Sequence, residues 1–520
     1  MTEIELKLLL PDAEAARRVL GSAALKARAE GPARRRRLRS IYFDAADGSL
    51  RAAGIAFRVR QVGRAWVQTV KRGPSESAGG GLYSVAESEC AAPGGRPDPA
   101  RIPDEALRDA VAAALNGSPL VPVFETDIQR TTRNLAAPGG LVELALDLGE
   151  VIAGNRRAAL AEAELELKDG APAALYDLAR EVFAEGGWRF SERTKAARGR
   201  ALSEGAPAVP APAPRRALDV PLARGETAET AAVRILRECL GQIDANMAAV
   251  LAAEAPEGPH QLRIGLRRLR TAFGLFREAL GGPALAELNA RARDLGARVG
   301  ALRDLDVQIG ETLARRLADP EAPDRAGLEA LKAALEDRRR AARAEVRAAL
   351  AGPEGRLFLL DLSAFAELRG WLAPADHAQT GALARPVEEV AAEALDRRWR
   401  KVRKAARGLA EADDHARHAL RKELKKLRYG VEFLGPLFPR RRVKGFVKRL
   451  KSLQEDFGAL NDAAVAEAMF AGPGAPCAAD PAAQRAAGRL LGALAERARA
   501  DRAAAEGDWA RLKAEPPFWR

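Results

Sequence analysis

The sequence predicts a chain of two parts with different fold classes: first an antiparallel β-sheet or barrel with a few helices, then an all-α bundle. In the first part, apolar and charged residues alternate with the period of two that is typical of a half-buried strand. In the second part, apolar residues recur with the 3.6-residue period of a helix. A Pro- and Ala-rich stretch at 203–221 separates the two patterns and indicates a semi-rigid spacer. We therefore predict domains at 1–202 and 222–520.

Alternating segments and intervening loops define the first part. The alternating segments are Glu3–Leu9, Ile55–Arg60, Trp66–Lys71, Leu141–Asp147 and Ala161–Lys168. Gly- and Pro-rich loops separate them, which favours antiparallel strands. Helical periodicity appears at Asp12–Leu20 and Ala173–Ala184. Arg34–Arg37 form a run of four arginines, which we interpret as a solvated loop that could at most assist substrate entry.

The second part contains an internal repeat. Apolar periodicity predicts helices over 226–253, 260–280, 284–318 and 325–350. His260-Gln-Leu-Arg263 recurs as His418-Ala-Leu-Arg421, and Gly300-Ala-Leu-Arg-Asp304 recurs as Gly458-Ala-Leu-Asn-Asp462. Both motifs recur at the same offset of 158 positions (418 − 260 and 462 − 304). A shared offset indicates duplicated helical units.

Charge and cysteine content restrict the partner and the compartment. The net charge of +13 and the pI of about 9.9 favour an acidic partner, which on charge alone is nucleic acid, anionic lipid or polyphosphate. The three cysteines are far apart and lack metal-ligand spacing, which favours a reducing compartment. We find no signal-peptide pattern and no apolar run as long as a membrane span. We expect a cytoplasmic protein without a membrane partner.

The charges on the predicted strands separate by sign. Glu3 and Glu5 share one strand face with Lys7, while Arg58 and Arg60 share another. For any single strand, a solvated outer face is the ordinary explanation. If the sheet closes with its charged faces inward, however, acidic and basic clusters face each other across a tunnel. Buried like charges need partners, and a multiply anionic ligand with divalent cations would satisfy both clusters.

Residues 1–202 resemble the CYTH family, also called triphosphate tunnel metalloenzymes. The motifs that carry the resemblance are Glu3-Ile-Glu5-Leu-Lys7, Tyr42-Phe43-Asp44, Phe57-Arg58-Val-Arg60, Gln68-Thr-Val-Lys71, Glu87-Ser-Glu89, Glu143-Leu-Ala-Leu-Asp147, Glu162-Ala-Glu164-Leu-Glu166-Leu-Lys168 and Lys195-Ala-Ala-Arg198-Gly199. The resemblance implies an eight-stranded antiparallel tunnel that cleaves a triphosphate with Mg²⁺ or Mn²⁺. One metal would neutralise phosphate charge, and a second would activate a water.

The resemblance also implies a role for each matching residue. The expected phosphate-binding residues are Lys7, Arg58, Arg60, Lys71, Arg130 and Lys195. The expected metal ligands are Glu3, Glu5, Glu87, Glu89, Glu164 and Glu166. Glu143 and Asp147 would position metal or substrate.

The repeated helices carry basic stripes beside their apolar faces. Positions 260, 263, 267 and 270 share one helix face, as do 418, 421, 425 and 428. A solvated face is the ordinary explanation for one such stripe, but duplication favours binding of a linear polyanion. Residues 222–520 resemble the CHAD family, which implies two pseudo-symmetric four-helix bundles that bind inorganic polyphosphate. The ligand residues implied are His260, Arg263, Arg267, Arg268, Arg270, His418, Arg421, Lys422, Lys425, Lys426 and Arg428.

The sequence thus predicts metal-dependent hydrolysis of inorganic triphosphate in the first domain and polyphosphate binding in the second. Recruitment to polyphosphate granules follows as a hypothesis, and we expect no specific nucleic-acid partner. An adenylate cyclase or a nucleoside or thiamine triphosphatase is the enzymatic alternative. These activities need a pocket for an organic group, which the aromatic content of 5% disfavours. The other alternative is a non-catalytic polyphosphate scaffold, which would not require so many carboxylates.

Overall fold

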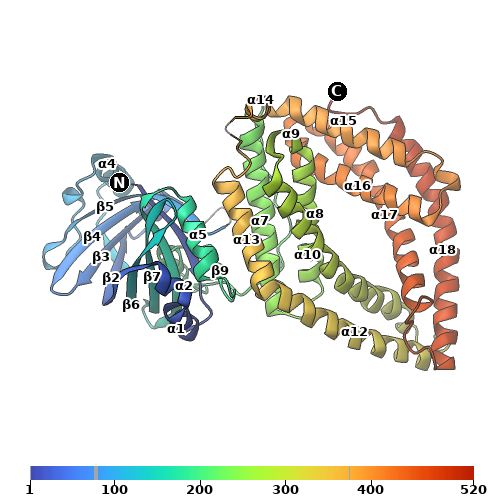
Figure 1. Cartoon of the computed structure of the whole chain (residues 1–520), viewed down its shortest axis with the longest axis horizontal. Helices are drawn as coiled ribbons and strands as arrows, with labels where there is room; N and C mark the ends of the chain where they lie inside the picture. The colour runs from blue at the N-terminus through green and yellow to red at the C-terminus, as the bar shows by residue number, and fades with distance from the viewer. Residues whose placement is uncertain (1, 75–79, 374) are drawn as a thin grey trace. The chain divides into compact units, whose positions relative to one another are not determined.

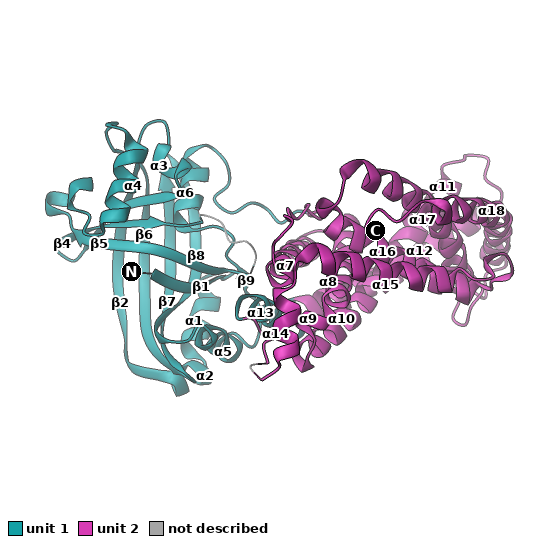
Figure 2. Ribbon diagram, turned by 90° about the horizontal axis from the view of Figure 1, so that it is seen from above, with its two compact units in different colours: residues 1–213, 351–368 teal, residues 214–350, 369–520 magenta. Residues whose placement is uncertain are grey.

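The computed structural model describes residues 2–74, 80–373 and 375–520 and contains two compact units. The first unit comprises residues 1–213 with 351–368, and the second comprises residues 214–350 with 369–520 (Figure 2). Over the described residues, no helix is both long enough and apolar enough to cross a membrane.

A closed antiparallel barrel forms the centre of the first unit (Figure 1). Its strands are β1 (Thr2–Leu9), β2 (Ala29–Asp44), β3 (Ile55–Val62), β4 (Ala65–Arg72), β5 (Leu82–Ala91), β6 (Val121–Ala137), β7 (Gly140–Ala153) and β8 (Arg156–Gly170). The strand order is β5-β4-β3-β2-β6-β7-β8-β1, and pairing of β1 with β5 closes the barrel. A ninth short strand, β9 (Arg189–Phe190), also pairs with β1. The predicted antiparallel barrel of eight strands is confirmed.

Helices cover the outside of the barrel, so its apolar strand faces point outward. The helices of this part are α1 (Ala13–Gly21), α2 (Ala23–Arg28), α3 (Ser49–Ala52), α4 (Glu105–Leu115), α5 (Ala173–Val182) and α6 (Lys195–Ser203). Phe57 and Val59 of β3 are fully buried in a core that includes Leu107 and Val111 of α4. Because side chains alternate along a strand, Arg58 and Arg60 point to the barrel interior. The outer helices therefore allow the interior to be polar.

The basic run Arg34–Arg37 lies in strand β2, so our interpretation of it as a loop is wrong. Residues 34–37 pair with 129–132 of β6, and this pairing, which is not local in sequence, supplies the strand's hydrogen bonds. Arg37 also forms an ion pair with Asp127 across the two strands at 2.6 Å. Long-range pairing here overrides the absence of local alternation.

The second unit consists of two sets of four long helices. The first set is α7 (Ala228–Ala252), α8 (Glu257–Leu275), α10 (Pro283–Val307) and α12 (Arg325–Ala351). The second set is α15 (Val387–Ala405), α16 (Asp414–Leu434), α17 (Arg440–Phe470) and α18 (Pro481–Ala514). Each helix of the second set begins within two residues of the position that the offset of 158 assigns to it. The prediction of duplicated four-helix units is confirmed.

Shorter helices complete this part of the chain. They are α9 (Arg277–Leu280), η3 (Gln308–Leu313), α11 (Ala314–Leu317), α14 (His377–Ala384), η4 (Leu409–Glu411) and η5 (Gly435–Leu437). The C-terminal part of the predicted spacer is fixed on α7, because Arg215 donates its backbone N–H to Asn246 at 3.0 Å. Helix α13 (Pro353–Glu367) lies between the two repeats in sequence, yet it packs within the first unit. The predicted second domain at 222–520 includes α13, whereas the structure groups this helix with the first unit.

Candidate functional site

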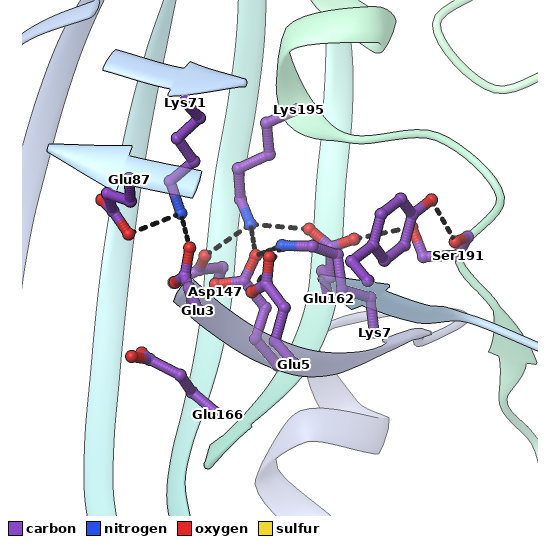
Figure 3. Close-up of polar contacts among 12 residues, drawn as sticks. Glu3, Glu5, Lys7, Lys71, Glu87, Asp147, Glu162, Glu166, Ser191 and Lys195 are labelled. Atoms are coloured by element: carbon purple, nitrogen blue, oxygen red, sulfur yellow. Dashed lines mark hydrogen bonds and ion pairs between the residues drawn. The ribbon is translucent and has the colours of Figure 1, made fainter. Parts of the chain in front are cut away.

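The barrel interior brings together most of the charged residues predicted from the first-domain motifs. Strand register places Lys7 opposite Glu164 and Glu5 opposite Glu166. On the next pair of strands, Asp147 lies opposite Glu162. Figure 3 shows the carboxylates and ammonium groups of β1, β4, β5, β7, β8 and α6 pointing toward one another.

Lys195 lies at the centre of a buried ion cluster. Its Nζ is 2.6 Å from Glu162 Oε2, 2.6 Å from Glu164 Oε1 and 2.9 Å from Asp147 Oδ2. Glu164 also pairs with Lys7 at 2.5 Å and with Arg130 at 2.5 Å. Burial opposes ionisation of these carboxylates, but the cations outweigh it and hold the pKa values of Asp147, Glu162 and Glu164 below their ordinary values. The cluster therefore remains charged.

Sequence reasoning overlooked three members of this cluster. Glu162 is fully buried and accepts hydrogen bonds from Arg198 and from the Ser191 hydroxyl, both at 2.8 Å. Glu162 belongs to the alternating Glu series of β8, and Arg198 lies one helical turn after Lys195. The sequence pattern could therefore have predicted that both residues belong to the site. Ser191 follows the short strand β9, and no sequence pattern indicated that it belongs to the site. Arg198 and Ser191 therefore fix the Glu162 carboxylate, which in turn holds Lys195.

The carboxylates of the β1 end form an acidic wall with incomplete compensation. Glu3 pairs with Lys71, which also lies 3.2 Å from Glu87, and Glu5 pairs with Lys7 at 2.8 Å. Burial raises the pKa of both Glu3 and Glu5, and nearby Glu87 and Glu164 add to the rise. Three carboxylates of the acidic wall, Glu3, Glu5 and Glu87, thus share the two lysines Lys7 and Lys71.

Arginines of β3 form a basic wall. Arg60 donates to the Ser40 hydroxyl at 3.1 Å, and among the described residues no carboxylate lies within ion-pair distance of it. Burial, with repulsion from Arg58 and Arg130, lowers the pKa of Arg60 to about 9. Arg58 lies 3.8 Å from Glu87 and 3.6 Å from Glu89, and it also forms a hydrogen bond with the Tyr42 side chain. The basic wall therefore favours an anion.

The remaining predicted residues of the first domain lie at the edges of these clusters. Glu166 lies to one side of the Lys195 cluster in Figure 3 and pairs with Lys168 at 2.6 Å, while Glu143 is 3.9 Å from the same lysine. Glu89 accepts from the Thr69 hydroxyl at 2.6 Å, and half of its side chain is exposed. Within the described ranges, no three His, Cys, Asp or Glu side chains stand together as a ready metal site.

The helical unit carries a second charged cluster on α8 and α16, the repeated helices. Arg263 donates to Asp304 at 2.9 Å, and His418 Nδ1 lies 3.0 Å from Asn461 Oδ1. Arg263 and Asp304 recur in the second repeat as Arg421 and Asp462, whereas His418 and Asn461 correspond to His260 and Arg303. Lys425 of α16 has its pKa lowered to about 6 by burial and by repulsion from surrounding arginines, which are Arg267, Arg421, Arg263 and Arg428. Concentrated positive charge of this kind is characteristic of a polyanion site.

Not all predicted residues of the second domain join this cluster. Arg268 is only 4% exposed, pairs with Glu432 and has its guanidinium 4.3 Å from the centre of the Phe433 ring, so its contacts are internal to the fold. Polar side chains hold two others, since Arg270 donates to Asn289 and Lys426 donates to Glu423. Arg428 donates to Gln454 but also lies near Lys425 of the cluster. His260 is partly buried, and burial with repulsion from Arg303 lowers its pKa.

Two domain families account for most of the chain. Residues 1–199 match the CYTH domain and residues 234–471 match the CHAD domain. This chain joins a CYTH domain to a CHAD domain. The crystal structure of the CHAD domain from the plant Ricinus communis covers 59% of this chain and 99% of its own, with 27% sequence identity and a TM-score of 0.50. The repeated four-helix architecture described above is therefore that of a CHAD domain.

Curated relatives match parts of the chain. An inorganic triphosphatase of Haemophilus influenzae is 36% identical over 85 residues, which are 16% of this chain and 24% of that protein. The uncharacterized protein Rv2226 of Mycobacterium tuberculosis is 28% identical over 191 residues, which are 35% of each chain. The matches thus span about a quarter to about a third of these relatives' lengths.

Proposed function

We propose that the CYTH barrel hydrolyses inorganic triphosphate with the help of a divalent metal ion. The observation that carries the proposal is the pair of opposed walls. Arg60 has no carboxylate within ion-pair distance among the described residues, whereas the three carboxylates Glu3, Glu5 and Glu87 share Lys7 and Lys71. A metal ion bound to a phosphate chain satisfies both walls at once. The 36% identity to a segment of an inorganic triphosphatase supports the same substrate.

Some of the predicted carboxylates fit a metal better than others. Glu3, Glu5 and Glu87 offer hard oxygen ligands where burial and mutual repulsion raise the pKa of Glu3 and Glu5. Glu164 fits less well, because Lys7, Arg130 and Lys195 already surround it. A bound Mg²⁺ or Mn²⁺ would supply charge neutralisation and a more acidic water.

The protein's own side chains then have distinct tasks. Arg58 and Arg60 bind phosphate oxygens and stabilise the charge on the leaving group. Lys195 and Arg130 hold Asp147 and Glu164 in place, since each lies within 2.9 Å of both carboxylates. We regard Lys195 and Arg130 as positioning residues.

A substrate comparison tests this proposal. We expect the full chain with Mg²⁺ or Mn²⁺ to release phosphate from tripolyphosphate much faster than from ATP or thiamine triphosphate, because the walls offer charge rather than a surface for an organic group. Chelation of the metal should abolish release. Phosphate and cyclic AMP are measured in parallel, and formation of cyclic AMP from ATP would identify a cyclase instead. Binding of tripolyphosphate without turnover would support the non-catalytic scaffold.

We also infer that the CHAD domain binds inorganic polyphosphate through α8 and α16, which would recruit the barrel to the polymer. Support comes from the cluster of Arg263, Arg267, Arg421 and Lys425. Its basic side chains outnumber the two nearby carboxylates, those of Asp304 and Asp462. Spaced point charges suit a linear phosphate chain, since recognition needs no base contacts. Arg268 is left out of this site because its contacts are buried.

Polyphosphate binding is expected to strengthen as the pH falls from 8 to 7. Lys425, with a pKa of about 6, is mostly neutral in the free protein at pH 8, and a bound polyanion favours its charged form. Binding then takes up a proton, so affinity should rise by up to about tenfold per pH unit.

The measurement is fluorescence anisotropy of labelled polyphosphate at constant salt, since salt alone changes affinity. Lys425→Met should flatten the pH dependence. Lys422→Met removes an exposed charge of the same helix, and should weaken binding at every pH while preserving the slope. A slope that persists in Lys425→Met would contradict the assignment.

A further inference from the structure

Helix α13 has no counterpart in the duplicated part of the chain. The repeat accounts for the eight long helices of the second unit, and α13 lies in the segment that connects the two sets. The chain leaves the second unit at 351, forms α13 within the first unit, and returns at 368 (Figure 2). Helix α13 packs against α5 of the barrel unit, where Arg180 pairs with Asp361 at 2.6 Å. The repeat by itself gives no reason for this placement.

A buried hydrogen-bond chain links α13 to the loop that enters β5. The Ser363 hydroxyl donates to the Gly80 carbonyl at 3.2 Å and lies 2.9 Å from the Tyr176 hydroxyl of α5. Ser363 and Tyr176 are both fully buried. Because a serine hydroxyl has one hydrogen, which Gly80 accepts, Tyr176 donates to Ser363. The backbone at Gly80 is thus held by a side chain of α13.

The next residue, Gly81, holds the backbone of Lys7. Lys7 donates its N–H to the Gly81 carbonyl at 2.9 Å, and its own carbonyl accepts from the Ser191 N–H at 3.0 Å. At this point β1 exchanges its partner β5 for β9. Gly81 has φ +68°, and an added Cβ would lie 2.7 Å from the Lys7 carbonyl oxygen. Such close approach leaves little freedom between Gly81 and Lys7.

We propose that α13 is a positioning element of the tunnel, and that Ser363 acts on Lys7 through the Gly80–Gly81 turn. The turn sets where the Lys7 backbone lies, and therefore where its Nζ meets Glu5 and Glu164. Helix α13 follows α12 directly in the chain, with Gly352 between them. This inference rests on the proposed function, because Lys7 contacts Glu5 and Glu164 of the proposed barrel site.

The test compares two substitutions on α13 in the full chain. Ser363→Ala removes the hydrogen bond to Gly80, and we expect KM for tripolyphosphate to rise roughly threefold to tenfold, with kcat changed by less than about twofold. Asp361→Asn is the matched control. Asp361 lies on the same helix as Ser363, and its substitution weakens the contact with Arg180 of α5 but leaves the hydrogen bond to Gly80 in place. Hydrogen exchange of a peptide covering β1 should be faster in Ser363→Ala and unchanged in Asp361→Asn.

The possible outcomes are distinct. An unchanged KM and unchanged β1 exchange in Ser363→Ala overturn the inference. Equal losses in both variants, accompanied by equal falls in melting temperature, also overturn it, since α13 would then act only through stability. If the wild-type chain hydrolyses no triphosphate, the proposed function fails. In that case tripolyphosphate binding and β1 exchange still decide whether Ser363 positions Lys7.

Discussion

Replacing Glu5 with Gln is expected to lower the rate of tripolyphosphate hydrolysis by roughly 100-fold or more, because an active-site electrostatic contact often contributes that much. Glu5 is 4% exposed and lies in the acidic wall, where burial raises its pKa. Gln keeps the size of the side chain but removes the negative charge that a divalent cation requires. Lys7 retains Glu164 at 2.5 Å, so the fold should persist.

Glu125→Gln provides the matched control for this effect. Glu125 lies on the outer side of β6 and pairs with Arg39 at 2.8 Å, so its loss should leave turnover unchanged. Initial rates are measured over a range of Mg²⁺ and Mn²⁺ concentrations, together with binding of labelled polyphosphate. We expect Glu5→Gln to retain polymer binding. Wild-type turnover in Glu5→Gln would remove Glu5 from the proposed site.

Lys195→Met is expected to destabilise the barrel by about 3–5 kcal/mol, because removing one partner leaves buried charges uncompensated. Lys195 is 6% exposed and lies within 2.9 Å of carboxylates from Asp147, Glu162 and Glu164. The two domains need not unfold together, so a local measurement is required. Hydrogen exchange of peptides from β7 and β8 reports the opening free energy of this region.

Lys168→Met serves as the control, since Lys168 pairs with Glu166 at 2.6 Å but is 37% exposed, and such pairs contribute less than about 1 kcal/mol. An effect of Lys195→Met no larger than that of Lys168→Met would contradict the central role of Lys195.

The cost of Lys195→Met should also depend on pH. In the wild-type barrel, burial opposes ionisation of Glu162 and Glu164, but Lys195 helps to hold each pKa below the ordinary value of 4.5. A carboxylate with a lowered folded-state pKa stabilises the fold above the unfolded value and loses this contribution as the pH falls. The deficit of Lys195→Met is therefore expected to be largest above pH 4.5 and to shrink below it. Exchange measured across this interval tests the sign.

Regular local patterns explain the parts of the fold that the sequence predicted well. The alternation of Glu3 to Leu9 predicts β1, and the recurrence of His260 and His418 predicts that α8 and α16 are equivalent helices. Arg34–Arg37 shows the opposite case, because its strand conformation depends on pairing with β6, which lies about 90 positions away in sequence. The placement of α13 was equally inaccessible, since an apolar helix does not specify which surface it covers.

The sequence by itself determined the barrel, the helical repeat and the types of charge inside each, because side-chain periodicity and residue chemistry are local properties. Only the tertiary structure decided how these charges combine. It showed that Lys195 is held by three carboxylates, whereas Arg60 has none within ion-pair distance among the described residues. It also placed Ser363 beside Gly80. These relations depend on strand register and helix packing, which bring together residues far apart in the chain.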